Sequence, residues 1–266
     1  YLRNISQNNN WQLYFRSYHA DDHCVGQMYL EMYARFEKPY MIEPTQWVLD
    51  WVKAHPSDAK LEFRTPYCQD RWSWCDSLFM SPPVWARLGA LTGDMDYYAY
   101  MDKEWWATTD YLYDKDEHLY YRDSRFFDQR ETNGKKVFWG RGNGWVYGGL
   151  TRVIDYLPQN YPSRGRYIEL YKQMTEKLLS LQQEDGLWKS SLLDPGSHKL
   201  PETSGSGFFT YGLAWGINRG ILDRDTCLPA AQKAWAGLLR CVHPDGKLGW
   251  VQRIAGSPGN VVADMT

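Results

Sequence analysis

The sequence lacks the charge and the long apolar runs of nucleic-acid-binding and membrane proteins. Its formal net charge is −2 over 266 residues, and its isoelectric point lies near 6.3. Binding to nucleic acid or to an anionic membrane surface normally needs a basic face, so we expect neither partner. No apolar run approaches the roughly 18–20 residues that span a bilayer. The opening YLRNISQNNNW shows no signal-peptide pattern, which leaves export open.

Cysteine is also scarce. The chain has five, which are scattered and form no CxxC pair: Cys24, Cys68, Cys75, Cys227 and Cys241. An odd, unpaired set argues against a disulfide framework or a zinc ribbon. We expect most of them to be small buried apolar side chains.

Aromatic residues, in contrast, are abundant. The chain has 14 tryptophans and 20 tyrosines, and aromatic residues make up 16% of it. A core can absorb many such rings, so packing is the first interpretation. Indole and phenol rings also present flat amphipathic faces, which can stack on sugars, and the composition therefore favours a carbohydrate site.

Helical patterns dominate the chain. Residues 24–36 place apolar side chains three and four positions apart, which is the spacing of one helical face. Similar patterns occupy residues 44–54, 77–91, 95–112, 144–157, 164–183, 206–218 and 228–242. The breaks between them hold glycine, proline or aspartate, which end one helix and begin the next. The sequence therefore predicts an all-α protein.

The breaks contain a repeated motif. DEHLYYR (116–122), DGLWKSS (185–191) and DGKLGWVQ (245–252) each follow a helix and predict a tight turn before a short extended piece. SDAKLEFR (57–64) matches more loosely. The leucines fall at 61, 119, 187 and 248, at spacings of 58, 68 and 61 residues. Two helices and a loop repeated at this length predict an array of αα-hairpins.

The loops favour a closed ring over an open solenoid, because they carry tryptophans and glycines where solenoid connections are usually short and polar. We therefore expect an (α/α)6 barrel, a toroid of six hairpins, as a single catalytic domain over residues 1–266. Six units of about 62 residues need roughly 370 residues. The chain shows about four units, so we expect the ring to be incomplete at both ends.

Asp76 is the charged residue of the stretch WSWCDSLFM. An ionised carboxylate is costly in apolar surroundings unless it is paired, and burial raises its pKa. The aspartate could cap the helix that follows by accepting backbone N–H bonds. It could instead be an acid held protonated by a tryptophan-lined pocket, as general acid catalysis near neutral pH requires.

A second acidic site precedes the helix at 24–36. Asp21 and Asp22 lie just before it, and we expect one of them to cap it. His19 and His23 have a spacing that also suits a metal, but no third ligand cluster accompanies them, so we expect no metal. Asp21 and Asp76 begin hairpins 55 residues apart. They could meet at the mouth of the ring as an acid/base pair.

The segment VFWGRGNGWVYGGL, residues 137–150, combines glycines with two tryptophans and an arginine. We expect its first glycines to let the backbone turn sharply into a helix. Trp139, Arg141 and Trp145 would then project near one another. They suit a sugar that bears a carboxylate, because arginine binds carboxylates through two parallel hydrogen bonds. The alternative is an arginine that stacks between aromatic rings for purely structural reasons.

Four long segments carry a family resemblance: WCDSLFMSPP, FWGRGNGWVYGGLTRVIDYLP, LQQEDGLWKSSLLD and ETSGSGFFTYGLAWGINRGILD. They closely resemble the unsaturated rhamnogalacturonyl hydrolases of glycoside hydrolase family 105, which are related to the unsaturated glucuronyl hydrolases of family 88. The resemblance runs over nearly the whole chain and implies an (α/α)6 barrel. It also implies a polysaccharide-degrading glycosidase without a cofactor, which removes a 4,5-unsaturated uronic acid from the non-reducing end of lyase-generated oligosaccharides.

The resemblance assigns the two carboxylates. The general acid of the family falls on Asp76 in the motif W-x-D-x-L-x-M. It protonates the C4=C5 vinyl ether at C4 and activates the water that adds at C5, after which the hemiketal opens and the glycosidic bond breaks. The second carboxylate falls on Asp21, with Asp22 as the competitor. It binds sugar hydroxyls and keeps Asp76 protonated through like-charge repulsion.

The same resemblance gives the substrate-binding residues. They are Trp74 of the catalytic motif and the W-x-R-x-x-x-W residues Trp139, Arg141 and Trp145. Arg122 stands where some members carry a substrate-facing histidine, so the identity of the leaving sugar stays open.

We expect an unsaturated oligosaccharide as the partner, in a bacterial cytoplasm or periplasm. Two alternatives remain from the residues alone. One is a conventional glycosidase that acts on saturated uronic acids. The other is a non-catalytic carbohydrate-binding toroid.

Overall fold

The computed structural model describes residues 1–64, 69–259 and 261. Its long helices are α3 (Gly26–Phe36), α4 (Glu43–Ala54), α6 (Pro82–Thr92), α7 (Met95–Leu112), α8 (Gly140–Tyr156), α9 (Arg164–Leu181), α10 (Thr203–Asn218) and α11 (Arg224–Leu239). Short helices are α1 (Leu2–Asn8), α2 (Ala20–His23), α5 (Ser77–Met80) and the 3-10 helices η1 (Pro39–Met41) and η2 (Ser124–Phe126). Strands β1 (Tyr113–Asp114) and β2 (Leu119–Tyr120) pair antiparallel, with Tyr113 opposite Tyr120. The all-α prediction is confirmed.

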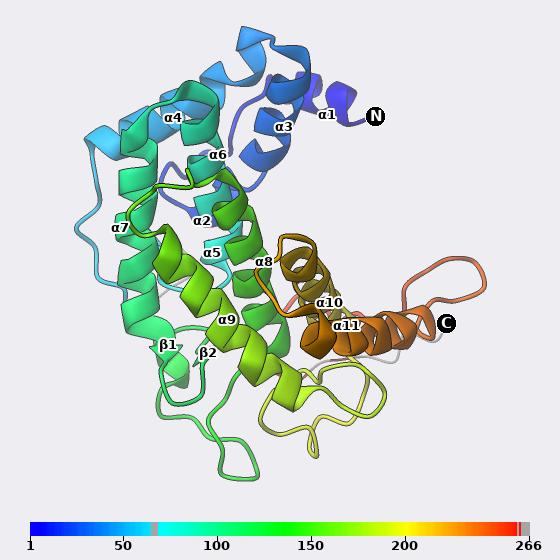
Figure 1. Cartoon of the computed structure of the whole chain (residues 1–266). Coiled ribbons are helices and arrows are strands. Elements are labelled where there is room, and N and C mark those ends of the chain that lie inside the picture. The colour runs from blue at the N-terminus through cyan, green and yellow to red at the C-terminus, as the bar shows by residue number, and fades with distance from the viewer. Residues whose placement is uncertain (65–68, 260, 262–266) are drawn as a thin grey trace.

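The long helices follow one another as hairpins along a curved path, α3 with α4, α6 with α7, α8 with α9 and α10 with α11 (Figure 1). The first helices of successive hairpins contact one another in order, α3 with α6, α6 with α8 and α8 with α10. The short helices α2 and α5 also touch each other, and α5 touches α8. The beginnings of these first helices therefore gather at one end of the array.

The repeated motif forms the predicted turns. Each of the three closer copies has a residue with left-handed φ one or two positions before the repeated leucine: His118, Gly186 and Gly246. Each turn also has an aspartate whose Oδ1 accepts a backbone N–H two residues later: Asp114, Asp185 and Asp245. Isolated antiparallel bridges join the extended pieces to other segments, for example Trp139 with Ser191. These turns and bridges thus fix the loops that lie beside the beginnings of the first helices.

The predicted helix over 77–91 is wrong in one respect, because the structure divides it into α5 and α6 at Ser81. Pro82 and Pro83 have no backbone N–H with which to extend α5, and a proline fits the first turn of the next helix. The Oγ of Ser81 accepts a hydrogen bond from the indole N–H of Trp85 at 3.1 Å. Helices α8, α10 and α11 begin three or four residues before the predicted positions, where small and polar residues weaken the apolar periodicity.

The glycines of α8 permit close packing and do not turn the backbone. Gly140, Gly142 and Gly144 lie inside the helix, without the positive φ that a sharp turn would use, so that prediction is wrong. A Cβ at Gly140 would lie 2.6 Å from the carbonyl oxygen of Lys189. A Cβ at Gly149 would lie 2.3 Å from the backbone oxygen of Leu78 in α5. Helix α8 therefore approaches its neighbours more closely than a methyl group allows.

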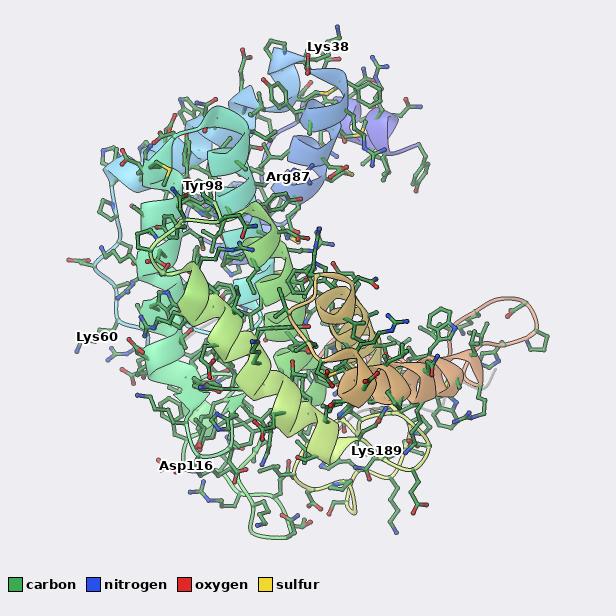
Figure 2. The ribbon with its side chains drawn as sticks, viewed as in Figure 1. Lys38, Lys60, Arg87, Tyr98, Asp116 and Lys189 are labelled. Carbon is green, nitrogen blue, oxygen red and sulfur yellow. The ribbon has the colours of Figure 1, made fainter. Side chains whose placement is uncertain are left out.

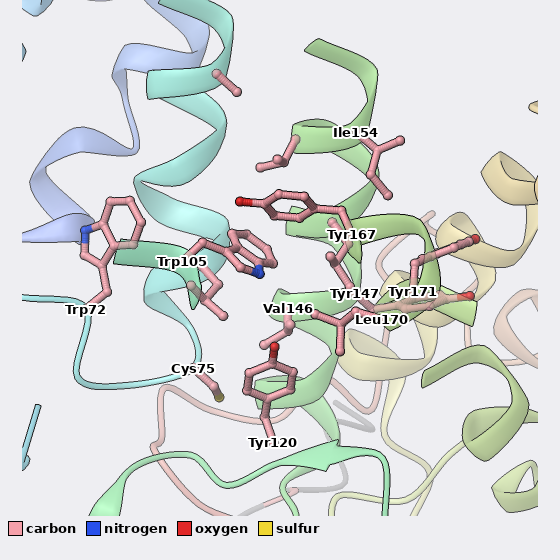
Figure 3. Close-up of a cluster of buried hydrophobic side chains, with 14 of the residues drawn as sticks. Trp72, Cys75, Trp105, Tyr120, Val146, Tyr147, Ile154, Tyr167, Leu170 and Tyr171 are labelled. Carbon is pink, nitrogen blue, oxygen red and sulfur yellow. The ribbon is translucent and has the colours of Figure 1, made fainter. Parts of the chain in front are cut away.

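Most of the aromatic excess serves the core. Trp105 of α7, Tyr120 of β2, Tyr147 of α8 and Tyr167 and Tyr171 of α9 are buried together (Figure 3). The rings of Tyr147 and Tyr171 stack with centroids 4.8 Å apart, and those of Trp105 and Tyr167 meet edge to face at 5.3 Å. Such pairs stabilise the fold beyond the area that they bury.

Charged side chains cover the exterior, as Lys38, Lys60 and Asp116 illustrate (Figure 2). Among the described residues, no helix combines the length and the apolar character needed to cross a membrane.

The described cysteines are free thiols. Cys75, Cys227 and Cys241 are buried as predicted, and Cys24 is partly buried. Cys68 lies outside the described residues.

His23 is a buried neutral histidine. Its Nδ1 lies 2.7 Å from the Oγ of Ser81 and its Nε2 lies 2.8 Å from the carbonyl oxygen of Ser17. Burial lowers the pKa of His23 to about 4. The imidazole therefore joins the beginning of α2 to the α5–α6 junction as an uncharged group.

We expect His23 alone to reduce the free energy of unfolding by about 2 kcal/mol between pH 7 and pH 5. The folded pKa lies below that of an unfolded histidine, so the unfolded chain binds the extra proton in this window, and stability falls as the pH falls. His23→Gln keeps a donor and an acceptor and should flatten this part of a denaturant-derived stability profile. The exposed control His55→Gln should leave this part of the profile unchanged. An unchanged slope in His23→Gln would refute the assignment.

Candidate active site

A cavity of about 470 Å³ lies where the first helices begin, within the size range of small-molecule sites. Seven of the eight residues predicted from the sequence line it: Asp21, Trp74, Asp76, Arg122, Trp139, Arg141 and Trp145. Met80 and four residues of the segment 251–255 complete the wall. Side chains up to 234 positions apart in the sequence thus share one cavity.

Asp76 sits directly before α5, but its carboxylate makes no capping hydrogen bond. Its side chain is 12% exposed. The thiol of Cys75 donates to its Oδ1 at 3.3 Å, and the Nε of Arg122 lies 3.8 Å from the same oxygen. The capping interpretation is therefore not supported, and the carboxyl group is left facing the cavity.

The surroundings raise the pKa of Asp76 above its usual value. Burial is the main cause, and the negative charge of Asp21 adds to it. The positive charge of Arg122 and the hydrogen bond from Cys75 act in the opposite direction without cancelling the rise. Asp76 therefore has the environment of an acid that keeps its proton to a higher pH than an exposed aspartate.

Asp21 lies at the rim of the cavity with its side chain 52% exposed. It does not cap α2, because the Nδ1 of His19 accepts the backbone N–H of Asp21 at 3.3 Å. Partial burial is the main cause that raises the pKa of Asp21, and the charge of Asp22 adds to it, while His19 and Arg16 oppose it. The carboxylate is available to a ligand.

Asp22 points to a different partner. Its carboxylate accepts the backbone N–H of Arg16 at 2.9 Å and two guanidinium bonds from the same residue at 3.1 and 2.5 Å. Its side chain is 3% exposed and does not line the cavity. The prediction that Asp22 binds substrate therefore finds no support in the geometry, and neither does the prediction that it or Asp21 caps the helix.

Trp139, Arg141 and Trp145 lie together as predicted. The guanidinium carbon of Arg141 lies 5.0 Å from the centroid of the Trp139 ring, and Trp145 packs against Phe79 with ring centroids 4.8 Å apart. Arg141 also donates to the carbonyl oxygens of Gln252 and Arg253, each at 2.6 Å. Its guanidinium thus has the structural role that the sequence left open, in addition to facing the cavity.

Arg122 lies between two aspartates, Asp123 and Asp76. Its Nη1 donates to Asp123 at 2.7 Å, and its guanidinium carbon lies 4.8 Å from the ring centroid of Phe63. The buried Nε has no hydrogen-bond partner among the described residues, although Asp76 lies 3.8 Å from it. Arg122 therefore places a positive charge directly beside Asp76.

The segment 251–255 also lines the cavity, although the sequence did not predict it as part of the site. Gln252 is 2% exposed, and its Oε1 accepts the indole N–H of Trp139 at 2.8 Å. The third copy of the repeated motif ends at Gln252, which is the sequence signal that could have placed this segment beside the helix beginnings.

The structure offers no metal centre among the described residues, because no three histidine, cysteine or acidic side chains gather as ligands. The nitrogens of His19 have partners in the backbone N–H of Asp21 and the Oε1 of Gln69 at 2.8 Å. Both nitrogens of His23 are also hydrogen-bonded, to Ser81 and Ser17. The spacing of these histidines reflects local structure.

The chain has helical hairpins that follow a curved path around a cavity of carboxylates and indoles. This is the architecture of the six-hairpin glycoside hydrolases, and fold and site assign the chain to this class. The chain belongs to Glycosyl Hydrolase Family 88, whose sequence profile matches residues 1–263. The predicted relationship to family 88 is confirmed, as is the prediction of a glycoside hydrolase. The likeness to family 105 is confirmed for the fold.

Two curated relatives share the name unsaturated 3S-rhamnoglycuronyl hydrolase. The chain is 42% identical to the one from Alteromonas sp. (strain LOR), over 98% of this chain and 66% of that protein. It is 42% identical to the one from Formosa agariphila, over 99% of this chain and 72% of that protein. The chain thus spans about two thirds of the length of these curated relatives.

Solved structures agree on the fold. A glycosyl hydrolase family 88 protein from Bacteroides vulgatus matches with a TM-score of 0.89 at 29% identity, over 99% of this chain and 78% of that one. A family 105 glycoside hydrolase from C. acetobutylicum matches with a TM-score of 0.75 at 23% identity, over 92% and 72%. The second match supports the fold alone.

Proposed function

We propose that this chain, as a single toroid domain, releases a 4,5-unsaturated uronic acid from the non-reducing end of oligosaccharides in which that acid is joined to rhamnose. Family membership and the names of the two curated relatives support the substrate class. The observation that carries the proposal is Asp76, a buried carboxyl group with a raised pKa that faces an aromatic-walled cavity.

The reaction uses one water and no other co-reactant. Asp76 transfers its proton to C4 of the vinyl ether, and the positive charge that develops at C5 is stabilised by the ring oxygen. Asp76, now ionised, accepts a proton from the water that adds at C5. The hemiketal opens by breaking the bond between C5 and the ring oxygen. The hemiacetal formed at C1 then releases the leaving sugar with the glycosidic oxygen.

The walls suit the proposed substrate. Trp145 is partly exposed and can stack on a sugar ring, while Trp74 and Trp139, each 2% exposed, form the apolar wall behind it. The guanidinium of Arg122 lies beside Asp76 in the cavity wall, where its positive charge can attract the uronate carboxylate. Asp21, partly exposed at the rim, is placed to accept from sugar hydroxyls. The guanidinium of Arg141 already donates to two backbone carbonyl oxygens, so its main role is to shape the cavity.

Turnover of matched unsaturated and saturated disaccharides tests this proposal. We expect loss of the ultraviolet absorbance of the C4=C5 bond together with release of the second sugar, and no cleavage of the saturated analogue. Cleavage of the saturated disaccharide at a comparable rate would instead identify a conventional glycosidase. Binding without turnover of either would identify a carbohydrate-binding toroid.

Asp21→Asn and Arg122→Gln should move the alkaline limb of the kcat/KM–pH profile in opposite directions. Asp76 must be protonated, so the rate falls as the pH rises through its pKa. The charge of Asp21 raises the pKa of Asp76, so removing it moves the limb to lower pH. The charge of Arg122 lowers the pKa of Asp76, so removing it moves the limb to higher pH.

The exposed control Arg35→Gln should leave the limb in place. A shift of both variants in the same direction would mean that the limb does not report Asp76.

A further inference from the structure

A second cavity, of about 510 Å³, borders the same C-terminal segment as the catalytic cavity. Its walls come from η2 and the loop after it, within 125–131, from Val137 and His198, and from residues 256–258. None of these residues lines the catalytic cavity. The proposed reaction gives this cavity no role.

The two cavities meet at Arg122 and Gly256. Arg122 lines the catalytic cavity, and Gly256 lines the second one. A Cβ at Gly256 would lie 3.4 Å from the guanidinium carbon of Arg122, so the backbone passes directly over this side chain. Arg125, which lines the second cavity, holds the same carboxylate as Arg122, with two bonds of 2.9 Å to Asp123. The two cavities are therefore neighbours on either side of this pair of arginines.

The second cavity contains an ordered polar group. The side chain of Glu131 is 10% exposed, accepts the hydroxyl of Ser191 at 2.6 Å and lies 3.4 Å from the Nε2 of His198. Phe126 and Val137 supply apolar surface beside it. Fixed acceptors and donors next to apolar side chains suit a hydroxylated ring.

Arg130 brings to the second cavity a positive charge that no carboxylate of the described residues pairs with. Its Nη1 donates to the carbonyl oxygens of Phe127 and Gln129 at 2.9 and 2.7 Å. No carboxylate forms an ion pair with it among the residues that the structure describes, whereas Arg125 is paired with Asp123. A charge that remains unpaired at a polar cavity favours an anionic ligand.

We propose that the second cavity binds the oligosaccharide beyond the sugar next to the scissile bond, and that Arg130 recognises an anionic group, a sulfate or a carboxylate, on that part of the chain. Glu131 and His198 hold the hydroxyls of the same unit. The inference rests on the proposed function, since it takes the catalytic cavity as the place of the unsaturated end. Longer anionic oligosaccharides are then better substrates than the disaccharide.

The test compares an unsaturated tetrasaccharide with the unsaturated disaccharide from the same lyase digest of a sulfated, rhamnose-containing polymer. In the wild type, kcat/KM for the tetrasaccharide should exceed that for the disaccharide. Arg130→Gln should lower this ratio about tenfold, mainly through KM, because a charge-assisted hydrogen bond is lost. His198→Gln should lower it in the same direction. Arg35→Gln, which removes an exposed guanidinium on α3, should keep the wild-type ratio.

A chemically desulfated tetrasaccharide identifies the anionic group. Loss of the length preference on desulfation assigns a sulfate to Arg130, and its retention assigns a carboxylate. An unchanged ratio in Arg130→Gln, with unchanged calorimetric affinity for the tetrasaccharide, would overturn the inference and leave the proposed function standing. Weakened calorimetric binding in Arg130→Gln, with no turnover of any substrate by the wild type, would overturn the proposed function alone.

Discussion

Asp76→Asn should lower kcat by about a thousandfold while the affinity for the unsaturated disaccharide changes only a few-fold. The amide has nearly the shape of the protonated acid, so the cavity stays intact. It cannot give a proton to C4 or accept one from water. The buried carboxyl group makes no capping bond that the substitution would break, so the loss should lie in the chemical step. Ultraviolet absorbance measures turnover, and titration calorimetry measures binding.

The matched control is Asp96→Asn, which changes an exposed aspartate in the first turn of α7. It should keep wild-type kcat. Near-native turnover by Asp76→Asn would show that another group supplies the proton. A loss of binding as large as the loss of turnover would show that Asp76 holds the substrate and does not act on it.

Gly149→Ala should destabilise the protein by about 3 kcal/mol, the upper part of the range for overpacked cores. The new methyl group would lie 2.3 Å from the carbonyl oxygen of Leu78 and 3.2 Å from the Cα of Phe79. Both contacts are backbone, so α5 must move as a unit. Asp76 directly precedes α5, and activity should therefore fall together with stability. Denaturant unfolding and kcat/KM on the same preparation measure the two effects.

Gly165→Ala provides the control on α9, because a Cβ there meets no atom within 4 Å. It should be neutral or stabilise by up to about 1 kcal/mol, since alanine favours a helix over glycine. Equal stabilities of the two variants would mean that α8 and α5 are not in the close contact described. Full activity in a destabilised Gly149→Ala would separate the position of α5 from catalysis.

The hairpin architecture could be predicted because its signals are local. Apolar periodicity marked the long helices, and the Asp-Gly turns at 185–186 and 245–246 marked the ends of the hairpins. The predicted position of Asp76 at a helix beginning also followed from local sequence. The seven predicted residues that share the cavity lie at or near the start of a first helix or in a repeated loop, and Trp74 and Arg122 among them were predicted from the family resemblance.

What the sequence did not reveal depends on contacts between distant segments. The carbonyl groups that hold Arg141 come from residues 111 and 112 positions later. Asp22 differs from Asp21 because Arg16 folds back onto it, and His19 replaces both as the cap of α2. The glycines of α8 look like turn residues until their close neighbours Lys189 and Leu78 are known.

The cavity that Arg130 lines also depends on contacts between distant segments. The loop of Arg130 and the segment 256–258 lie more than 120 positions apart in the sequence, and no local pattern marks them as one cavity. The second cavity could therefore be found only from the structure.

The reaction run in D2O tests the central claim, that Asp76 protonates the unsaturated bond, most directly. Proton transfer from one side chain should place a single deuteron at C4 of the released acid, on one face, as NMR at early times would show. Product incubated alone in D2O controls for later exchange. Release of the leaving sugar without deuterium at C4 would contradict the account, because it would mean that the glycosidic bond breaks without hydration of C4=C5.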